Sequence, residues 1–426
     1  MRLKLPARSQ MSTDRRQDSD FKAYRHGTHR TVEPAITLQR ARPHLRAMGI
    51  TRIANITGLD RIGLPVVTVC RPNARSLAVS QGKGLDLDSA KASGVMESVE
   101  AYHAEHIDAP LRCGSLRDLG ELLPLADVHA LPRSAGNRLD DELRLFWIEG
   151  HNRMDGSTLW LPLETVSADY TLPLPPGHGC FAASTNGLAS GNTLEEAVAH
   201  GICEVVERDA VALWKLQGER PRRATAVDLD TVDDPLCREA LGYFERAAVQ
   251  VKVWDATSDV GIATFCCLAY GENEDWADPE FGAGCHPTRE IALLRALTEA
   301  AQARTTFIAG AREDLGSALY TEGARRRRWT YCHALAAAHE NVRGFHEAPT
   351  LESDSLRVDV DWMLSRLRAV DIDQVIVVDL TREAFGLPVA RVVIPGLEGA
   401  YGHEQGDFVA GARARAVMPF SSITAA

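Results

Sequence analysis

The sequence predicts a mixed α/β protein, whose length suits two or three domains or one large domain with subdomains. Helical and strand-like segments alternate along the second half of the chain, and the sequence has no repeat of a fixed period. Three segments have the apolar spacing of amphipathic helices, and five short apolar segments are typical of buried strands. The helices are expected at residues 88–106, 193–216 and 287–309, and the strands at residues 66–70, 250–255, 262–269, 374–380 and 389–394.

The composition is that of an ordinary globular protein. Of 426 residues, 45% are hydrophobic and 25% are charged, and the net charge of −11 argues against a nucleic-acid binder held by phosphate contacts. No apolar stretch approaches the roughly 20 residues of a membrane span, and the N-terminus lacks the apolar core of a signal peptide. The nine cysteines include no C-x-x-C pair, so we expect reduced, structural cysteines in a cytoplasmic protein.

The N-terminal part leads into one helix and two strands. Residues 1–22 are polar and charged, and we expect them to be disordered. A helix is predicted at residues 34–48, with Gly49 as its C-terminal cap. Strands are predicted at residues 66–70 and 76–81.

An acidic helix is expected to follow these strands, at residues 88–106. Before it lies a Gly-Lys-Gly turn at residues 82–84, which has neither the spacing nor the Ser or Thr of a P-loop but can still lie near a ligand. Ser93, Glu97 and Glu100 share one face of the helix, and the two glutamates form an E-x-x-E pair.

A second acidic helix, at residues 193–216, repeats this spacing. Thr193 is its predicted N-cap. Four of its residues line one stripe, namely Glu196, His200, Glu204 and Glu207. Like charges at this spacing repel one another, so three acids on one stripe suggest a cation that binds them. If the two acidic helices face each other, their four carboxylates require cations between them. The alternative is a solvated acidic face.

Two further segments are candidates for ligand binding. The glycine-rich loop at residues 179–192 precedes the central helix, and small residues at a helix N-terminus suit the approach of a phosphate. On the helix at residues 287–309, Glu299 and Gln302 share a face with Arg295. The alternatives are an ordinary glycine-rich loop and surface charge.

Taken together, these segments resemble the YcaO family. The resemblance is clearest over about residues 24–345, and we expect one YcaO-type catalytic domain at residues 23–426. The S-x-x-x-E-x-x-E motif of the first acidic helix is one of its marks. The others are ITRIANITGLDRIGLPV at residues 50–66, NGLASGNTLEEAVAHGICEVVERDA at residues 186–210 and ALTEAAQAR at residues 296–304. The segment that begins with GTHR at residues 27–30 resembles the branch that accompanies a TfuA partner.

The resemblance implies an enzyme that uses ATP and Mg²⁺ to modify backbone amides of peptides or proteins. The implied metal ligands, which hold magnesium against the nucleotide phosphates, are Glu97, Glu100, Glu204 and Glu207, with Glu299 as a further candidate. The implied ATP-binding residues are Arg30, Thr37, Ser93, Asn192, Glu196, Arg208, Gln302 and Arg304. His200 is a candidate acid or base, and the alternative is a helix histidine with a local hydrogen bond.

Two departures from the family pattern bear on the product. Ala101 stands where the family commonly has an arginine, and the C-terminal tail has the single proline Pro419 in place of the P-x-P-x-P pattern of azoline-forming members. We therefore expect ATP-dependent activation of a peptide amide and sulfur attack, which gives a thioamide in a ribosomally made peptide or protein. An azoline-forming cyclodehydratase that acts on Cys, Ser or Thr of a precursor peptide is the alternative.

Two other classes of protein are weighed against this reading. The E-x-x-H pair of Glu100 and His103 fits a carboxylate-bridged di-metal oxidase, but such sites lie in four-helix bundles and the predicted strands do not fit one. A catalytically inactive scaffold or docking subunit would not need its four glutamates. The expected partners are the precursor peptide or protein and a TfuA-like partner or sulfur donor, and the family suggests a homodimer.

Overall fold

The computed structural model describes residues 20–135, 139–272, 278–337, 342–399 and 408–418. Within these residues the chain forms three main sheets, all antiparallel, with helices packed on them. The predicted mixed α/β class is thereby confirmed. None of the helices in these ranges is long and apolar enough to cross a membrane.

The first sheet and its helix form one compact unit. Its elements are β1 (Arg52–Asn55), β2 (Val66–Cys70), β3 (Val79–Lys83) and α3 (Leu87–Glu105). Helix α3 packs directly on the backbone of β3, because a Cβ at Gly82 would lie 2.0 Å from the carbonyl oxygen of Ala90. Only glycine permits such a close approach. The acidic helix is therefore fixed on this sheet by its backbone.

A second sheet later in the chain repeats this arrangement. Its elements are β10 (Gln250–Asp255), β11 (Thr264–Tyr270), β12 (Glu280–Cys285) and α8 (Arg289–Ala309). A Cβ at Gly282 would lie 2.3 Å from the carbonyl oxygen of Ala296 on α8. Each unit is thus a three-stranded antiparallel sheet whose strands are adjacent in sequence order, followed by a helix. A glycine in the last strand lets the helix pack directly on the strand backbone.

The third sheet has six strands. They are β4 (Leu111–Gly114), β6 (Leu145–Asn152), β7 (Thr158–Pro162), β8 (Leu188–Ser190), β14 (Ile376–Asp379) and β15 (Val389–Val393). The strand order is β4-β6-β14-β15-β8, and β7 pairs with β6. Two helices cover one face, α5 (Leu194–Leu216) and α10 (Leu356–Arg368), and residues of α3 pack against the other face. Strand β8 ends the sheet between α3 and α5.

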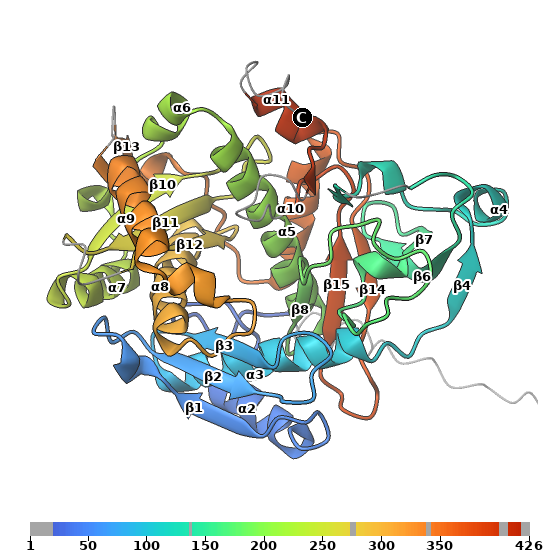
Figure 1. The fold of residues 1–426 in the computed structure, drawn as a ribbon, viewed down its shortest axis with the longest axis horizontal. Coiled ribbons are helices and arrows are strands. Elements are labelled where there is room, and N and C mark those ends of the chain that lie inside the picture. The colour runs from blue at the N-terminus through green and yellow to red at the C-terminus, as the bar shows by residue number, and fades with distance from the viewer. Residues whose placement is uncertain (1–19, 136–138, 273–277, 338–341, 400–407, 419–426) are drawn as a thin grey trace, which may run out of the picture.

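The remaining elements are short or peripheral. The helices are α2 (Pro34–Ala41), α4 (Leu116–Gly120), α6 (Glu219–Arg223), α7 (Pro235–Arg246), α9 (Glu322–Ala337) and α11 (Ala412–Val417). The strands are β5 (Arg133–Ser134), β9 (Val227–Asp228), β13 (Arg343–Gly344) and β16 (Phe408–Val409). Figure 1 shows α5 in the middle of the molecule, with β10–β12 on one side, β14 and β15 on the other, and α3 running beneath them.

Three predictions about the N-terminal part need correction. The helix expected at residues 34–48 ends at Ala41 and continues as a 3₁₀ turn, because Pro43 has no N–H to continue the α-helical ladder. The strand expected at residues 76–81 begins only at Val79. Of the segment predicted to be disordered, residues 1–19 lie outside the described ranges. Lys22 is buried, however, and its ammonium lies 2.6 Å from a carboxylate oxygen of Asp359.

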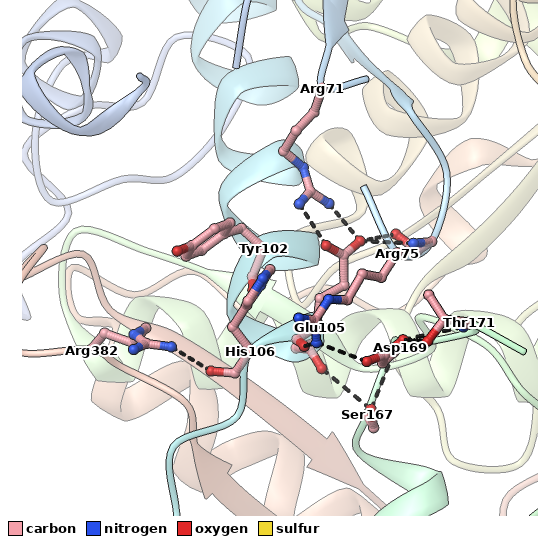
Figure 2. A network of polar contacts seen from close by, with 11 residues as sticks. Arg71, Arg75, Tyr102, Glu105, His106, Ser167, Asp169, Thr171 and Arg382 are labelled. Carbon is pink, nitrogen blue, oxygen red and sulfur yellow. Dashed lines mark hydrogen bonds and ion pairs between the residues drawn. The ribbon is translucent and has the colours of Figure 1, made fainter. Parts of the chain in front are cut away.

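The C-terminal end of α3 is anchored by the polar network in Figure 2. The buried Glu105 accepts two hydrogen bonds of 2.6 Å from the guanidinium of Arg71 and further ones from the backbone N–H and hydroxyl of Ser76. Although burial acts to raise the pKa of Glu105, these donors bring it below its usual value. Next to this pair, Arg75 is bonded to Asp169 at 2.9 Å. The network fixes the position of the helix that carries the first E-x-x-E pair.

Candidate active site

The five glutamates that the sequence singled out as metal ligands form one electrostatically coupled group. They come from three helices, with Glu97 and Glu100 on α3, Glu204 and Glu207 on α5, and Glu299 on α8. The charge of Glu204 raises the pKa of both glutamates on α3. The charge of Glu299 raises the pKa of both glutamates on α5. Segments far apart in the sequence therefore converge on one acidic centre.

Four of the five carboxylates, those on α3 and α5, have a raised pKa and are hard to ionise in the metal-free protein. Burial raises the pKa of Glu100 to about 8, and the neighbouring glutamates act in the same direction. Burial likewise raises the pKa of Glu207 to about 7. The pKa of Glu97 rises to about 7 as well, but its side chain is open to water, so burial counts for less there. Such a group of oxygen ligands fits divalent cations, which would remove the repulsion.

Backbone N–H groups hold most of these carboxylates in place. The N–H of Gln81 on β3 donates to Glu97 at 3.4 Å, and the N–H of Ala283 on β12 donates to Glu299 at 3.3 Å. The two donors stand at equivalent places in the two sheet–helix units, sixteen residues before their glutamates in each case. Glu299 is therefore the structural counterpart of Glu97, which strengthens its place among the candidate ligands.

The other two anchors come from neighbouring strands. The backbone N–H and the hydroxyl of Ser190, at the end of β8, donate to Glu100 at 2.8 and 2.7 Å. The N–H of Cys285, at the end of β12, donates to Glu207 at 3.0 Å. These neutral donors orient the carboxylates without neutralising their charge.

Basic side chains line the same centre. The ammonium of Lys83 lies 2.5 Å from Glu299, and it lowers the pKa of that carboxyl although burial acts to raise it. The guanidinium of Arg208 lies 3.8 Å from Glu204. From the sequence, the Gly-Lys-Gly turn was expected only to lie near a ligand, and no role was predicted for Lys83. A lysine between two glycines could have indicated a site residue. These cations are placed to meet the charge of a bound phosphate.

His200 has a different place from the one proposed for it. Arg295 on α8 donates to its Nε2 at 2.6 Å, so this nitrogen has no free lone pair. Burial and the charge of Arg295 hold the pKa of His200 well below its usual value. A general base needs a lone pair that can accept a proton, so the hydrogen bond from Arg295 does not favour His200 as the base. The spacing predicted that Arg295 shares a face with Glu299, one turn away, with surface charge as the alternative, and the contact with His200 shows that its guanidinium faces the protein interior.

Four of the predicted ATP-binding residues meet at the start of α5. Thr37 donates to Asn192 at 3.0 Å, Asn192 donates to Glu196 at 3.0 Å, and Arg30 donates to the same carboxylate oxygen at 3.0 Å. Thr193 is the N-cap, as predicted, and accepts from the N–H of Glu196. The Glu196 carboxylate turns toward Arg30 and the N–H of Thr31. The network links the N-terminal segment to the central helix.

The remaining predicted ATP-binding residues differ in their contacts. Ser93 lies on α3, one turn before Glu97, and Gln302 lies on α8, one turn after Glu299. Arg304, in contrast, is buried in a pair with Asp60, with N–O distances of 3.0 and 3.2 Å. All its described contacts are internal to the fold, so the structure favours a stabilising role for Arg304 over a nucleotide contact.

Another cluster could be mistaken for a metal site. Within the described ranges, one group of three potential ligand atoms lies within 4.8 Å, from His29, His286 and Asp359. The N–H of Thr288 donates to Nδ1 of His286, so Nε2 of that ring carries the proton and cannot bind a metal. Lys22 already neutralises Asp359. This cluster is therefore part of the core. The di-metal oxidase is excluded too, because α3 packs on sheets and not in a four-helix bundle.

Comparison with known proteins defines the class to which this fold and site belong. The sequence model of the family described as YcaO cyclodehydratase, ATP- and Mg²⁺-binding, matches residues 81–398. The chain belongs to the YcaO family. It is 35% identical, over 380 residues, to an uncharacterised protein in the tfuA 3′ region of Rhizobium leguminosarum bv. trifolii, and the match covers 87% of this chain and 88% of that protein.

Solved structures agree with this assignment. YcaO from Methanopyrus kandleri, bound with AMPPCP and Mg²⁺, superposes with a TM-score of 0.71 at 23% identity, over 91% of this chain and 99% of that one. A heterocyclase in complex with substrate and cofactor gives a TM-score of 0.70 at 25% identity over 90% of this chain, which spans 55% of the heterocyclase chain. Two predictions from the sequence are therefore confirmed: that the chain is a YcaO protein, and that ATP and Mg²⁺ are its cofactors.

Proposed function

We propose that this protein activates a backbone amide of a ribosomally made peptide or protein with ATP and Mg²⁺, and that sulfur attack converts the amide into a thioamide. The observation that carries the proposal is the coupled group of five glutamates, in which the pKa values of Glu97, Glu100 and Glu207 rise to between about 7 and about 8. Carboxylates repel nucleotide phosphates unless divalent cations lie between them. Acidic residues at a phosphate site therefore imply metal-bridged binding.

The chain's own residues divide into two sets with different tasks. Glu97, Glu100, Glu204 and Glu207 hold the metal, with Glu299 beside them. Magnesium, when bound, neutralises phosphate charge and fixes the phosphates for transfer. The nucleotide is bound by the set near the start of α5 and on the neighbouring helices, Arg30, Thr37, Ser93, Asn192, Glu196, Arg208 and Gln302. The described contacts of Arg304 leave it outside this set.

The reaction requires the amide oxygen to become a leaving group. Hydrosulfide, or an equivalent sulfur donor, adds to the amide carbon, and the oxygen of the adduct takes the γ-phosphoryl group from ATP. The carbon–oxygen bond then breaks, so that amide, hydrosulfide and ATP give thioamide, ADP and hydrogen phosphate. The protein positions the reactants and stabilises phosphate charge, and these tasks account for most catalysis of phosphoryl transfer. No protein nucleophile is needed.

Two observations bear on the partner and on the alternative product. The relative from Rhizobium lies beside tfuA, which supports a TfuA-like partner that delivers sulfur or substrate. The heterocyclase neighbour and the cyclodehydratase name of the family favour azoline formation as the second candidate. In that reaction a Cys, Ser or Thr side chain of the substrate replaces hydrosulfide. Pro419, on which the tail comparison depends, lies outside the described residues.

Calorimetric titration tests nucleotide binding directly. AMPPCP is titrated into the wild-type protein with Mg²⁺ and with EDTA, and then into Glu204→Gln. Glu195→Gln is the matched control, because Glu195 lies on the same helix but pairs with Arg153 at 2.8 Å, away from the group of five. We expect Mg²⁺-dependent binding that is lost in Glu204→Gln and kept in Glu195→Gln. If the wild-type protein binds no nucleotide in either condition, the proposed function is wrong.

The product is tested by mass spectrometry. The protein, ATP and Mg²⁺ are incubated with a peptide encoded beside the gene, a TfuA-like protein and sulfide. A thioamide product gains the mass of sulfur for oxygen, and an azoline product loses water. If the peptide loses water in the absence of sulfide, the product is an azoline and the proposed thioamide is wrong.

A further inference from the structure

A buried arginine lies in the middle of the six-stranded sheet. Arg391 is 3% exposed and occupies the central position of β15, whose other residues are valines and an alanine. Ala390 and Val392 pack into the core beneath α5, and Val389 and Val393 pack on the opposite face. Because side chains alternate along a strand, Arg391 lies on the opposite face, which also receives residues of α3. A strand buried on both faces would ordinarily carry an aliphatic residue here.

The guanidinium of Arg391 is mostly unpaired. Its Nη2 donates to the carbonyl oxygen of Ser184 at 2.8 Å. Its Nε and Nη1 are out of contact with water and have no acceptor among the described residues. The hydroxyl of Tyr170, which acts electrostatically on Arg391, is also buried without a partner. Buried donors of a charged group without acceptors are destabilising, so their retention indicates a ligand.

This guanidinium lies behind the metal-binding glutamates. Val389, which shares its face, pairs across the sheet with Ser190, and Ser190 donates to Glu100. The charge of Arg391 also lowers the pKa of Glu204, whose burial acts in the opposite direction. The arginine is therefore near both acidic helices, but on the side of the sheet that α3 covers.

Neutralising Glu204 does not explain this arginine. Among the described residues, the ion pairs closer than 4.0 Å include Arg208 with Glu204 but no pair between Arg391 and any glutamate. A counter-ion would use its N–H groups on the carboxylate, whereas these N–H groups remain without acceptors. No described residue supplies an acceptor for them, and a bound ligand can supply one.

The chemistry of the site indicates which acceptor this is. A magnesium ion that bridges a carboxylate and a phosphate has Mg–O distances of about 2.0–2.1 Å, so the two oxygens lie within about 4 Å of each other. Phosphate oxygens bound in this way would be acceptors close to Glu100 and Glu204, the glutamates nearest to Arg391 by strand pairing and by charge, and a guanidinium is well suited to bind phosphate. We propose that Arg391 binds the terminal phosphoryl group of magnesium-bound ATP, the group that is transferred to the amide oxygen. This assignment rests on the proposed function.

The test compares two nucleotides that differ in that group. AMPPCP and ADP, each with Mg²⁺, are titrated calorimetrically into the wild type, Arg391→Met and Arg391→Lys. We expect Arg391→Met to weaken AMPPCP binding by about tenfold to a hundredfold, the range for a hydrogen bond to a charged group. ADP binding should change by less than about twofold. Arg391→Lys, which keeps the charge and loses the planar fork, should lie between wild type and Arg391→Met for AMPPCP.

Thermal unfolding of the nucleotide-free proteins separates this role from a structural one. Arg71→Met is the matched control, because Arg71 is also 3% exposed but its guanidinium is fully engaged with Glu105. We expect Arg71→Met to lower Tm and Arg391→Met to leave it unchanged or raise it. Equal losses of AMPPCP and ADP binding, no loss of either, or a Tm that falls as in Arg71→Met would each overturn the assignment. Failure of the wild type to bind AMPPCP would instead refute the proposed function.

Discussion

Replacing Glu100 by glutamine should stabilise the metal-free protein while abolishing metal-dependent nucleotide binding. The pKa of Glu100 rises from 4.5 to about 8 in the folded protein, because of burial and the nearby glutamates. At pH 7.5 the unfolded chain releases this proton and the folded protein largely keeps it. Compared with a side chain that stays neutral in both states, this proton release lowers the free energy of unfolding by about 4 kcal/mol. Glutamine has no charge to suppress and still accepts the hydrogen bonds from Ser190.

The sign and size of the effect depend on pH. Because the folded protein binds more protons than the unfolded chain between about pH 4.5 and pH 8, the stability of the wild type falls as pH rises through this window. The stabilisation by Glu100→Gln should therefore shrink to about 1 kcal/mol at pH 5. For a chain of this length, about 4 kcal/mol corresponds to a Tm increase of roughly 4 °C at pH 7.5. Calorimetry at both pH values, in EDTA, measures the difference.

The matched control is Glu105→Gln on the same helix. Glu105 is paired with Arg71 and its pKa lies below its usual value, so this variant should lose stability at pH 7.5. In AMPPCP with Mg²⁺, the ligand should raise the Tm of the wild type and leave that of Glu100→Gln unchanged. A Tm increase for Glu100→Gln that is equal at pH 5 and pH 7.5, or a decrease at pH 7.5, would refute the electrostatic reasoning.

Three further variants or conditions test other parts of the site. EDTA should abolish the Tm increase that AMPPCP gives, and added Mg²⁺ should restore it, because the carboxylates repel phosphates without the metal. His200→Ala should weaken AMPPCP binding by about tenfold, because His200 holds Arg295 in position. The loss should be equal at pH 6 and pH 8, because the lowered pKa keeps His200 neutral at both. If calorimetry shows a loss of affinity that depends on pH, His200 is again a candidate acid or base. Arg304→Met should lower the free energy of unfolding by about 3–5 kcal/mol, since it leaves Asp60 buried and unpaired, and urea titration measures this loss. The AMPPCP affinity of the folded variant, measured without urea, should stay near that of the wild type if Arg304 has no nucleotide contact.

Periodicity in the sequence was sufficient to place the elements that carry the site. Helix α3 runs from Leu87 to Glu105 against a prediction of residues 88–106, and β10 has the predicted bounds. Both acidic stripes reach one centre because each lies along one face of a long helix, and the spacing determines that face. The eight-residue strand β6 was missed, because Gly150 and His151 break its apolar alternation.

Contacts between distant segments could not be read from the sequence. Nothing in the local pattern shows that Lys83 pairs with a glutamate on α8, or that Arg304 pairs with a residue of the N-terminal unit. The end of α2 was misjudged although Pro43 was visible, because the prediction placed the C-terminal cap at Gly49. Arg391 could be recognised from the sequence, since a charge within an apolar strand requires a partner. Its one described hydrogen-bond acceptor, Ser184, lies outside the strand and could not be read from the local pattern.

The two equivalent sheet–helix units explain why the five glutamates are not alike before a nucleotide binds. Glu97 and Glu299 occupy the same place in the two units and accept equivalent backbone N–H groups. Lys83, at the end of the first sheet, neutralises Glu299 of the second unit, so the pKa of Glu299 falls while that of Glu97 rises. The unsatisfied charge is therefore concentrated on α3 and α5. A divalent cation bound between these two helices, where the two E-x-x-E pairs lie, would remove most of their repulsion, whereas Lys83 already compensates the charge of Glu299.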